Sequence, residues 1–145
     1  MPATNNQAAL AAARELFEKT FGEISSSAKV LAVHAPGRSE ISGNHTDHEG
    51  GHVIAGALDV AVDGVAVANG TNVVRVIDAN FPLVEVDLSD LSVREDERET
   101  TAALVRGMAF ELAQTGRTPA GFDFASVCSV PAGGGVFSAG AGGGG

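Results

Sequence analysis

The sequence lacks several features that would narrow its function at once. Its 145 residues include no Trp and no Tyr, so seven Phe residues supply every aromatic side chain. We therefore expect a core built mainly from Val, Leu, Ile and Ala. A single cysteine, Cys128, excludes an internal disulfide, and its place in an apolar run predicts a small buried thiol.

Basic residues are also scarce. Nine Lys and Arg stand against eighteen Asp and Glu, which gives a formal net charge of −9. This charge repels phosphodiester backbones and anionic lipid, so it disfavours binding to nucleic acid or to a membrane surface. No apolar run approaches about 18 residues, the length of a membrane span. Because the N-terminus also lacks signal-peptide features, we expect one domain located in the cytoplasm.

The spacing of apolar residues predicts an α+β fold. A helix is expected from Thr4 or Asn5 to about Phe21, followed by a short strand at residues 30–33 and a loop that contains Arg38. Further strands, antiparallel and joined by tight turns, are expected at residues 53–58, 60–68, 73–77 and 83–88.

The second half of the sequence predicts one more helix and one more strand. The helix is capped by Thr100 or Thr101 and is followed by a strand at residues 122–130. Its expected core face carries Leu104, Val105, Met108 and Leu112. Gly64, inside a strand, suggests a bulge or a bend.

Polar residues in these regions are expected to face solvent. The polar block at residues 92–99 is interpreted as a solvated connection or the start of the second helix. The aspartates interpreted as exposed strand and turn residues are Asp59, Asp63, Asp78, Asp87 and Asp90.

A polar segment punctuated by glycines follows the strand expected at residues 30–33. Asn44, His45 and Asp47 supply an amide, an imidazole and a carboxylate there, a set that can hydrogen-bond the hydroxyl groups of a sugar. Arg38, the one basic residue near this segment, could neutralise charge on a transferred phosphoryl group. The alternatives are a polar loop that binds nothing and, for Arg38, an ion pair with Glu40 or Asp47.

The same segment offers two metal-binding alternatives. Residues 48–52 match the H-E-x-x-H pattern, in which two histidines one helical turn apart hold zinc. Two adjacent glycines inside the pattern cost about 2 kcal/mol in a helix relative to Ala, and a strand follows directly. A looser site would use His45, Asp47 and His48. We rank both below sugar binding.

A second glycine-rich segment follows the last expected strand. Backbone N–H groups of Gly133, Gly134 and Gly135 could surround phosphate oxygens, with Ser138 nearby. The competing interpretation is a flexible tail, because the five glycines among residues 140–145 would cost on the order of 5 kcal/mol in a helix relative to Ala. The glycines alone do not decide between the two.

Together these segments resemble the galactokinases of the GHMP small-molecule kinase superfamily. The run from Ala35 to Gly51 is similar to the galactokinase signature at nearly every position. The resemblance implies an α+β GHMP kinase N-terminal domain, ribosomal-protein-S5-domain-2-like, and it implies that Arg38 stabilises the transition state. The residues implied to contact galactose are Asn44, His45, Thr46 and Asp47. Asn44 replaces a Glu of many relatives, which removes one carboxylate contact.

The second family motif, Pro-x-Gly-x-Gly-Leu-Ser-Ser-Ser-Ala, aligns with residues 131–140 and implies an ATP phosphate site. Only one of its three serines survives, as Ser138, while Ala139 occupies the position that would give Mg²⁺ a hydroxyl. Phe137 stands where a small polar group would meet phosphate. The family's catalytic Asp would lie beyond residue 145, so the sequence is expected to stop partway through an active site.

The resemblance therefore implies ATP- and Mg²⁺-dependent phosphorylation of galactose at its C1 hydroxyl, impaired in this chain. The alternative is a non-catalytic, sugar-binding pseudokinase. The expected organisation is a lead-in at residues 1–29, a kinase N-terminal domain at 30–139 and a glycine-rich tail at 140–145. We also expect exposed strand edges and apolar surface, through which chains could associate.

Overall fold

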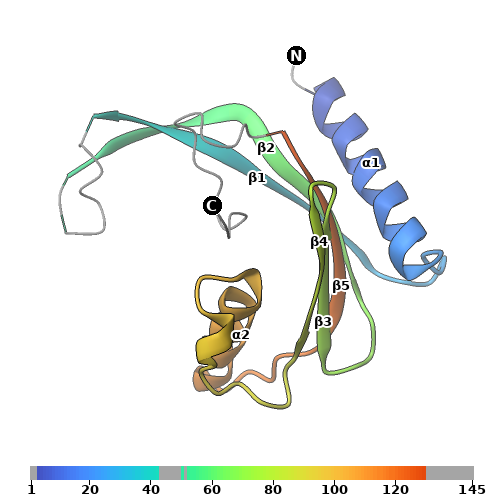
Figure 1. The fold of residues 1–145 in the computed structure, drawn as a ribbon. Coiled ribbons are helices and arrows are strands. Elements are labelled where there is room, and N and C mark those ends of the chain that lie inside the picture. The colour runs from blue at the N-terminus through green and yellow to red at the C-terminus, as the bar shows by residue number, and fades with distance from the viewer. Residues whose placement is uncertain (1–2, 43–49, 51, 130–145) are drawn as a thin grey trace.

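A computed structural model describes residues 3–42, 50 and 52–129 (Figure 1). Its elements follow in the order α1 (Ala3–Phe21), β1 (Val30–Ser42), β2 (Ile54–Ala68), β3 (Val73–Asp78), β4 (Phe81–Asp87), η2 (Glu95–Glu97), α2 (Thr101–Gln114) and β5 (Phe122–Cys128). The expected sequence of a helix, several strands, a helix and a strand is confirmed. No helix in this described part combines the length and the apolar character needed to cross a bilayer.

The five strands form one sheet in the order β1-β2-β5-β3-β4. Neighbouring strands are antiparallel except for β3 and β5, which run parallel. The antiparallel pairing expected among the strands of residues 53–88 is confirmed for β3 and β4, whereas β2 and β3 are separated by β5. The chain leaves the sheet after β4, passes through η2 and α2, and returns as β5 between the two hairpins, which gives β5 the direction of β3. The result is a mixed α+β sheet.

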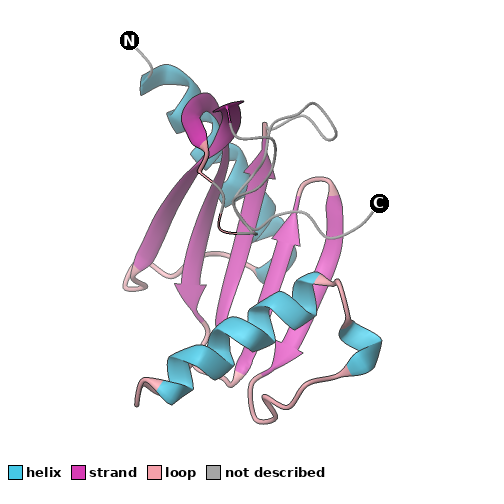
Figure 2. Cartoon of the chain, turned by 90° about the vertical axis from the view of Figure 1, so that its left-hand side faces the viewer, coloured by secondary structure: helices cyan, strands magenta, loops and turns pink. Residues whose placement is uncertain are grey.

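The two helices cover opposite faces of the sheet (Figure 2). On the α1 face, Phe17 packs with Val65 and with the fully buried Ala125. On the α2 face, Val74 and Val86 form the core together with Leu88 and Ala109. Successive strand residues point to opposite faces, so β3 contributes Val74 to the cluster on the α2 face and Ile77 to the cluster on the α1 face.

The apolar stripe expected to anchor α2 lies on its outer side. Leu104, Met108 and Leu112 are 45%, 58% and 38% exposed, and the buried residues of the helix are Arg106 and Ala109. The prediction of these three as core residues is wrong because a small residue and a fully paired arginine occupy the inner face instead. The spacing of apolar residues along a helix does not reveal a buried arginine whose charge is compensated inside the fold.

The start of α2 and the end of α1 follow local sequence signals, whereas the start of α1 differs from the expected one. Thr100 caps α2 as expected, since its side chain accepts a hydrogen bond from the Ala103 N–H. The helix α1 begins at Ala3, so Thr4 and Asn5 lie inside it rather than at its cap. Its expected end at Phe21 is confirmed, and Gly22 follows with a φ of 96°, a conformation that favours glycine.

Two strands are longer than expected. The strand β1 continues through Arg38 to Ser42, so Arg38 lies on a strand and not in a loop after one. The strand β2 is continuous where two segments were expected. The two strands pair with each other along nearly their whole length. This pairing outweighs the local preference of the glycines and the proline for loops.

Gly64 and Pro82 have roles other than those expected. Gly64 keeps a regular register with both neighbouring strands, so no bulge occurs there. A Cβ at Gly64 would lie 2.5 Å from the ring of Phe124, so the glycine allows a close approach of that ring. Pro82 lies within β4, which begins two residues before the strand expected at residues 83–88. An edge strand tolerates the missing N–H of a proline.

Candidate functional site

The β1–β2 hairpin bends at Gly37. Pro36 pairs with Ala61 and Arg38 pairs with Ala57, so β1 advances by two residues while β2 advances by four. Three residues of β2 therefore face the buried Gly37. Such irregularities bend a strand and redirect its side chains. The outer part of the hairpin leans over the side of the sheet on which α2 lies (Figure 1).

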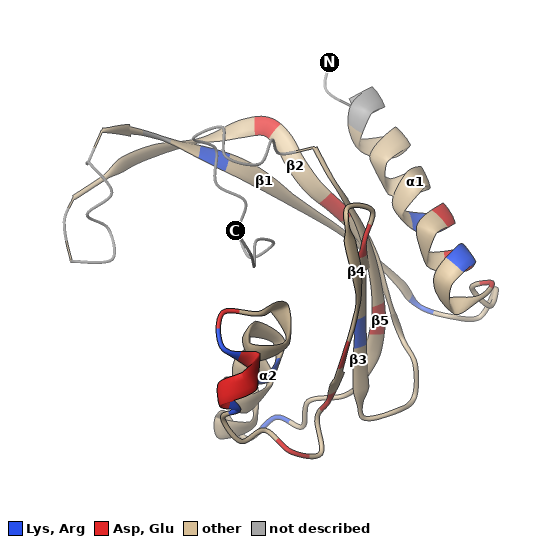
Figure 3. Cartoon of the chain, viewed as in Figure 1, with Lys and Arg blue, Asp and Glu red and all other residues tan. Residues whose placement is uncertain are grey.

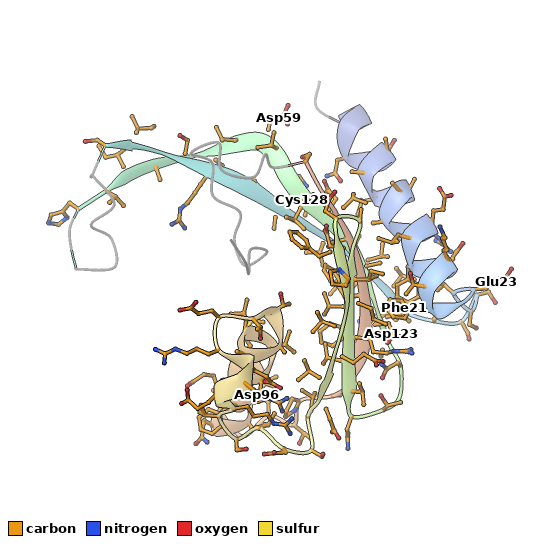
Figure 4. The ribbon with its side chains drawn as sticks, viewed as in Figure 1. Phe21, Glu23, Asp59, Asp96, Asp123 and Cys128 are labelled. Atoms are coloured by element: carbon orange, nitrogen blue, oxygen red, sulfur yellow. The ribbon has the colours of Figure 1, made fainter. Side chains whose placement is uncertain are left out.

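Arg38 lies directly after this bend. It is exposed on β1, and its backbone is held in register with β2. The side chain of Asp59, one of the three residues opposite Gly37, is exposed at the bend, where Figure 4 labels it. An arginine carried by a paired strand is positioned more closely than one on a free loop. The bend thus fixes the position of the Arg38 backbone. The polar segment follows β1 in the sequence, a few residues after Arg38.

The chain returns to this bend after β5. Ser129 Oγ accepts a hydrogen bond from Ala61 N–H (2.9 Å) and donates one to Ala61 O (3.1 Å). The Ser129 N–H donates to the same carbonyl at 2.9 Å. Ala61 stands opposite Pro36, which precedes the bend at Gly37. Ser129, two positions before the second glycine-rich segment, is therefore bonded to the residue that faces Pro36 across the hairpin.

A histidine and an aspartate are hydrogen-bonded on the same hairpin. His34 Nδ1 is 2.7 Å from Asp63 Oδ1, and Asp63 is only 5% exposed. The prediction that Asp63 faces solvent is therefore wrong, because the imidazole across the strand pair supplies its hydrogen-bond partner. Asp63 has the same parity on β2 as the core residue Val65, so the pair belongs to the face covered by α1.

Two further carboxylates have hydrogen-bond partners inside the fold, and Asp78 is less exposed than expected. Asp78 is half-buried and accepts a hydrogen bond from Ser126 Oγ at 2.7 Å. Asp123, which is buried, accepts from Arg75 through both of its oxygens. This hydrogen bond raises the pKa of Arg75. The Arg75 guanidinium also lies 4.9 Å from the centre of the Phe21 ring, a cation–π contact that ties α1 to the sheet.

A further group of acidic residues lies between the end of β4 and α2 (Figure 3). Hydrogen bonds from the Ser92 side chain and N–H hold the pKa of Asp90 well below its usual range. The hydrogen bond from Arg106 lowers the pKa of Glu97. The polar block at residues 92–99 is therefore a connection held by ion pairs, more ordered than a solvated link.

Most expected ligand contacts lie outside the described residues. This holds for the galactose residues Asn44, His45, Thr46 and Asp47, and for the phosphate residues Gly133, Gly134, Gly135 and Ser138. Of the site residues expected from the sequence, Arg38 alone lies within the described part of the chain. Cys128, expected to be buried, is half-buried.

The metal-binding alternatives gain no support from the described residues. Gly50 lies in a turn with a φ of 79°, which is not helical, so the histidine spacing of residues 48–52 cannot be that of one helical turn. Among residues 3–42, 50 and 52–129, no three His, Cys, Asp or Glu side chains are grouped to hold a metal ion. Ala139 supplies no side-chain oxygen. The donor set therefore does not fit Mg²⁺.

Comparison with known proteins settles the family. The galactokinase galactose-binding signature matches residues 15–68, which contain the bent hairpin. The galactokinase of Lactococcus lactis subsp. cremoris is 31% identical over 137 residues, 92% of this chain and 33% of that protein. The galactokinase of Lactiplantibacillus plantarum is 36% identical over 108 residues, 72% of this chain and 27% of that protein. The chain belongs to the galactokinase family.

A solved galactokinase shares the fold. The crystal structure of Lactococcus lactis galactokinase complexed with galactose superposes with a TM-score of 0.69 at 27% identity, covering 84% of this chain and 31% of that one. The mixed sheet is thus that of the GHMP kinase N-terminal domain, as expected. The chain spans about a third of the length of the galactokinases it matches.

Two features of this galactokinase-family site escaped the sequence reasoning. The bend at Gly37 depends on an unequal count of residues in two paired strands, which no single segment reveals. Ser129 did carry a signal, because it is a polar residue within the apolar run at residues 125–130, two positions before Pro131. Its bonds to Ala61 could not be predicted, since the two residues are 68 positions apart.

Proposed function

We propose that this chain forms the sugar-binding part of a kinase that transfers the γ-phosphoryl group of ATP to the C1 hydroxyl of galactose. The observation that carries the proposal is the bonding of Ser129 to Ala61, opposite Pro36. Ser129 lies two positions before Pro131 in the sequence, so its bonding to Ala61 supports a phosphate motif that begins close to the bend. Phosphoryl transfer depends on positioning two substrates together, so this proximity is what the reaction requires.

The residues of the signature have distinct proposed roles. Asn44, His45, Thr46 and Asp47 bind galactose, with the Asp47 carboxylate accepting hydrogen bonds from ring hydroxyls. Arg38 stabilises the negative charge that develops on the transferred phosphoryl group. Its place on a paired strand favours this role, because a preorganised cation needs little rearrangement during the reaction.

The proposed ATP-binding part of the site departs further from the family motif than the sugar-binding part does. Gly133, Gly134, Gly135 and Ser138 are proposed to bind the ATP phosphates through backbone N–H groups and one hydroxyl. Ala139 stands at the position of the family's metal-binding serine, and Phe137 stands where a small polar group would meet phosphate. These departures favour the second candidate function, which is galactose binding without phosphoryl transfer.

Calorimetric titration with galactose tests the sugar site. We expect binding by the wild type and a loss of binding in Asp47→Ala, because the variant lacks the carboxylate that accepts from the sugar. Glu23→Ala, an exposed residue after α1 that Figure 4 labels, serves as the matched control. Failure of the wild type to bind galactose would exclude both candidate functions.

An assay for galactose 1-phosphate separates the two candidates. The purified chain is incubated with galactose, ATP and Mg²⁺, and Arg38→Ala is measured beside it. Product that disappears in Arg38→Ala supports the kinase. Galactose binding without product identifies the chain as a sugar-binding module.

A further inference from the structure

We infer that the free edge of β1 pairs with the same edge of a second copy of this chain, which joins two sheets into one. This inference goes beyond the proposed function and does not depend on it. It concerns residues 30–34, the first part of β1, which lies at the end of the strand order and pairs with β2 alone among the described strands. Such an edge presents unpaired backbone groups that another strand can use.

The hydrogen bonds at the two ends of β2 show which of its backbone groups are turned toward β1. Near one end, Ala61 O accepts from the Ser129 N–H at 2.9 Å. Directly after the other end, the Asn69 N–H donates to Gly121 O at 3.4 Å. The odd-numbered residues of this stretch are therefore bonded on the β5 side. Because backbone groups alternate in direction along a strand, the even-numbered residues of β2 are bonded to β1.

This alternation identifies the free backbone groups of β1. The residues of β1 that pair with the even-numbered residues of β2 are Leu31, Val33 and Ala35. The N–H and C=O groups of the residues between them point away from the sheet, and these residues are Val30, Ala32 and His34. Residues 30–34 thus form a short edge whose outward hydrogen-bonding groups have no partner strand in the described part of the chain.

Antiparallel pairing about a two-fold axis lets one strand edge meet itself. Centred on Ala32, it pairs Ala32 with Ala32 of the second copy and Val30 with His34, so each outward-pointing residue gains a partner. Leu31, which is 59% exposed in the single chain, then lies opposite Val33 of the second copy. Such apolar cross-strand pairs stabilise a sheet. Pro36 has no N–H to donate, so it ends the free edge.

The other edge of the sheet is protected against the same pairing. The Leu88 N–H donates to Asn72 O on the β3 side at 2.8 Å, so the odd-numbered residues at this end of β4 point outward, and they include Glu85 and Asp87. Two copies of β4 would bring these carboxylates together, and like charges on paired strands repel. Residues 30–34 contain no Asp, Glu, Lys or Arg. In a chain with a net charge of −9, this neutral edge is the one suited to a second copy.

Amide hydrogen exchange measured by NMR at rising protein concentration tests the inference. The Ala32 and His34 amides should exchange more slowly as the concentration rises, because they are bonded only in the paired state. The Leu31 and Val33 amides are bonded to β2 in both states and should change little. An alternating response along one strand is specific to edge pairing, since association through the exposed stripe of α2 would not produce it.

Two variants of the edge should lose the pairing in sedimentation experiments. Ala32→Pro removes an outward N–H and keeps the bonds to β2, a place where an edge strand tolerates proline. Leu31→Lys keeps the backbone and places a charge opposite Val33 of the second copy, so it should raise the dissociation constant of the pair. The matched control is Leu83→Lys, which makes the same change at a residue of β4 that is 42% exposed and should leave the pairing unchanged.

Each outcome decides the question. A wild type that stays monomeric at every concentration overturns the inference. Self-association in which Ala32 and His34 exchange at the same rate at every concentration also overturns it, and Met108→Lys then tests the stripe of α2 as the source. Unchanged pairing in Leu31→Lys, or in Ala32→Pro that is folded by circular dichroism, overturns it as well. None of these outcomes alters the galactose measurements that test the proposed function.

Discussion

Arg106 holds Glu97 through two parallel hydrogen bonds. Its Nε lies 2.8 Å from Glu97 Oε2, and its Nη2 lies 2.7 Å from Glu97 Oε1. A third nitrogen, Nη1, donates to the backbone carbonyls of Asp87 and Asp90. The hydrogen bond to Glu97 also raises the pKa of Arg106. One buried guanidinium thus fastens α2 to the end of β4 and to the connection between them.

Replacing Arg106 should destabilise the fold. Arg106→Met keeps the apolar stem but removes the bonds to Glu97 and to two carbonyls, so we expect a loss of about 2 kcal/mol in the free energy of unfolding. Urea denaturation measures it. The control is Arg94→Met, because the Arg94 side chain is 40% exposed in its pair with Asp90 and should contribute less than about 1 kcal/mol. Equal losses in both variants would contradict the central role of Arg106.

The Glu97 carboxylate should contribute to acid sensitivity. Because Arg106 lowers the pKa of Glu97 in the folded state, the stabilisation is complete above the pKa of an unfolded glutamate, about 4.3. It is lost as the pH falls through the lower folded pKa. Glu97→Gln should therefore be less stable than the wild type at pH 7, with a smaller loss on acidification.

Thermal unfolding from pH 7 to pH 3 checks this. Glu111→Gln, which removes an exposed carboxylate from α2, should keep the acid dependence of the wild type. If the stability of Glu97→Gln fell with pH as steeply as that of the wild type, the Arg106–Glu97 ion pair would not be a source of the acid sensitivity. Asp87 and Asp90, whose pKa values are also lowered, supply the part that remains.

Two glycines should respond oppositely to the same substitution. An added Cβ at Gly64 would lie 2.5 Å from the Phe124 ring and 2.9 Å from the Ala125 carbonyl oxygen. Gly64→Ala should therefore lower stability by about 1–3 kcal/mol, as overpacking does. Gly107 lies inside α2 with open space around it, so Gly107→Ala should raise stability by up to about 1 kcal/mol. Differential scanning calorimetry measures both, and a tolerated Gly64→Ala would show that Phe124 can move aside.

The exposed stripe on α2 should promote association between chains. Leu104, Met108 and Leu112 lie four residues apart on one helix surface and are all exposed. Contiguous apolar surface of this kind drives self-association. Met108→Lys should shift sedimentation toward the monomer at high protein concentration. Val93→Lys, which changes an isolated residue that is 90% exposed, should leave sedimentation as it is in the wild type.

The sequence predicted those parts of the fold that depend on local chemistry. The end of α1 at Phe21, the cap at Thr100 and the identity of β3 and β5 as strands all follow from nearby residues. The galactokinase resemblance was equally accessible, because the signature is a contiguous run of residues that the comparisons also match.

What it missed depends on partners distant in the chain. Asp63 is buried because His34 faces it across a strand pair, and Gly64 is required because Phe124 lies against it. Arg106 displaced the leucines from the inner face of α2 because Glu97 and two carbonyls compensate its charge. Each misassigned residue is explained by a contact that the spacing of apolar residues does not reveal. The ligand positions of residues 44–47 and 133–138 stay predictions.

The position of β5 determines when this sheet can form. It is the last of the described strands in the chain, yet it lies between β2 and β3. Until it arrives, β1–β2 and β3–β4 are two hairpins with no hydrogen bonds between them. A nascent chain on the ribosome would therefore expose both hairpins until residues 122–128 emerge. Assembly of the sheet becomes one late event that closes contacts far apart in sequence, a topology that slows folding.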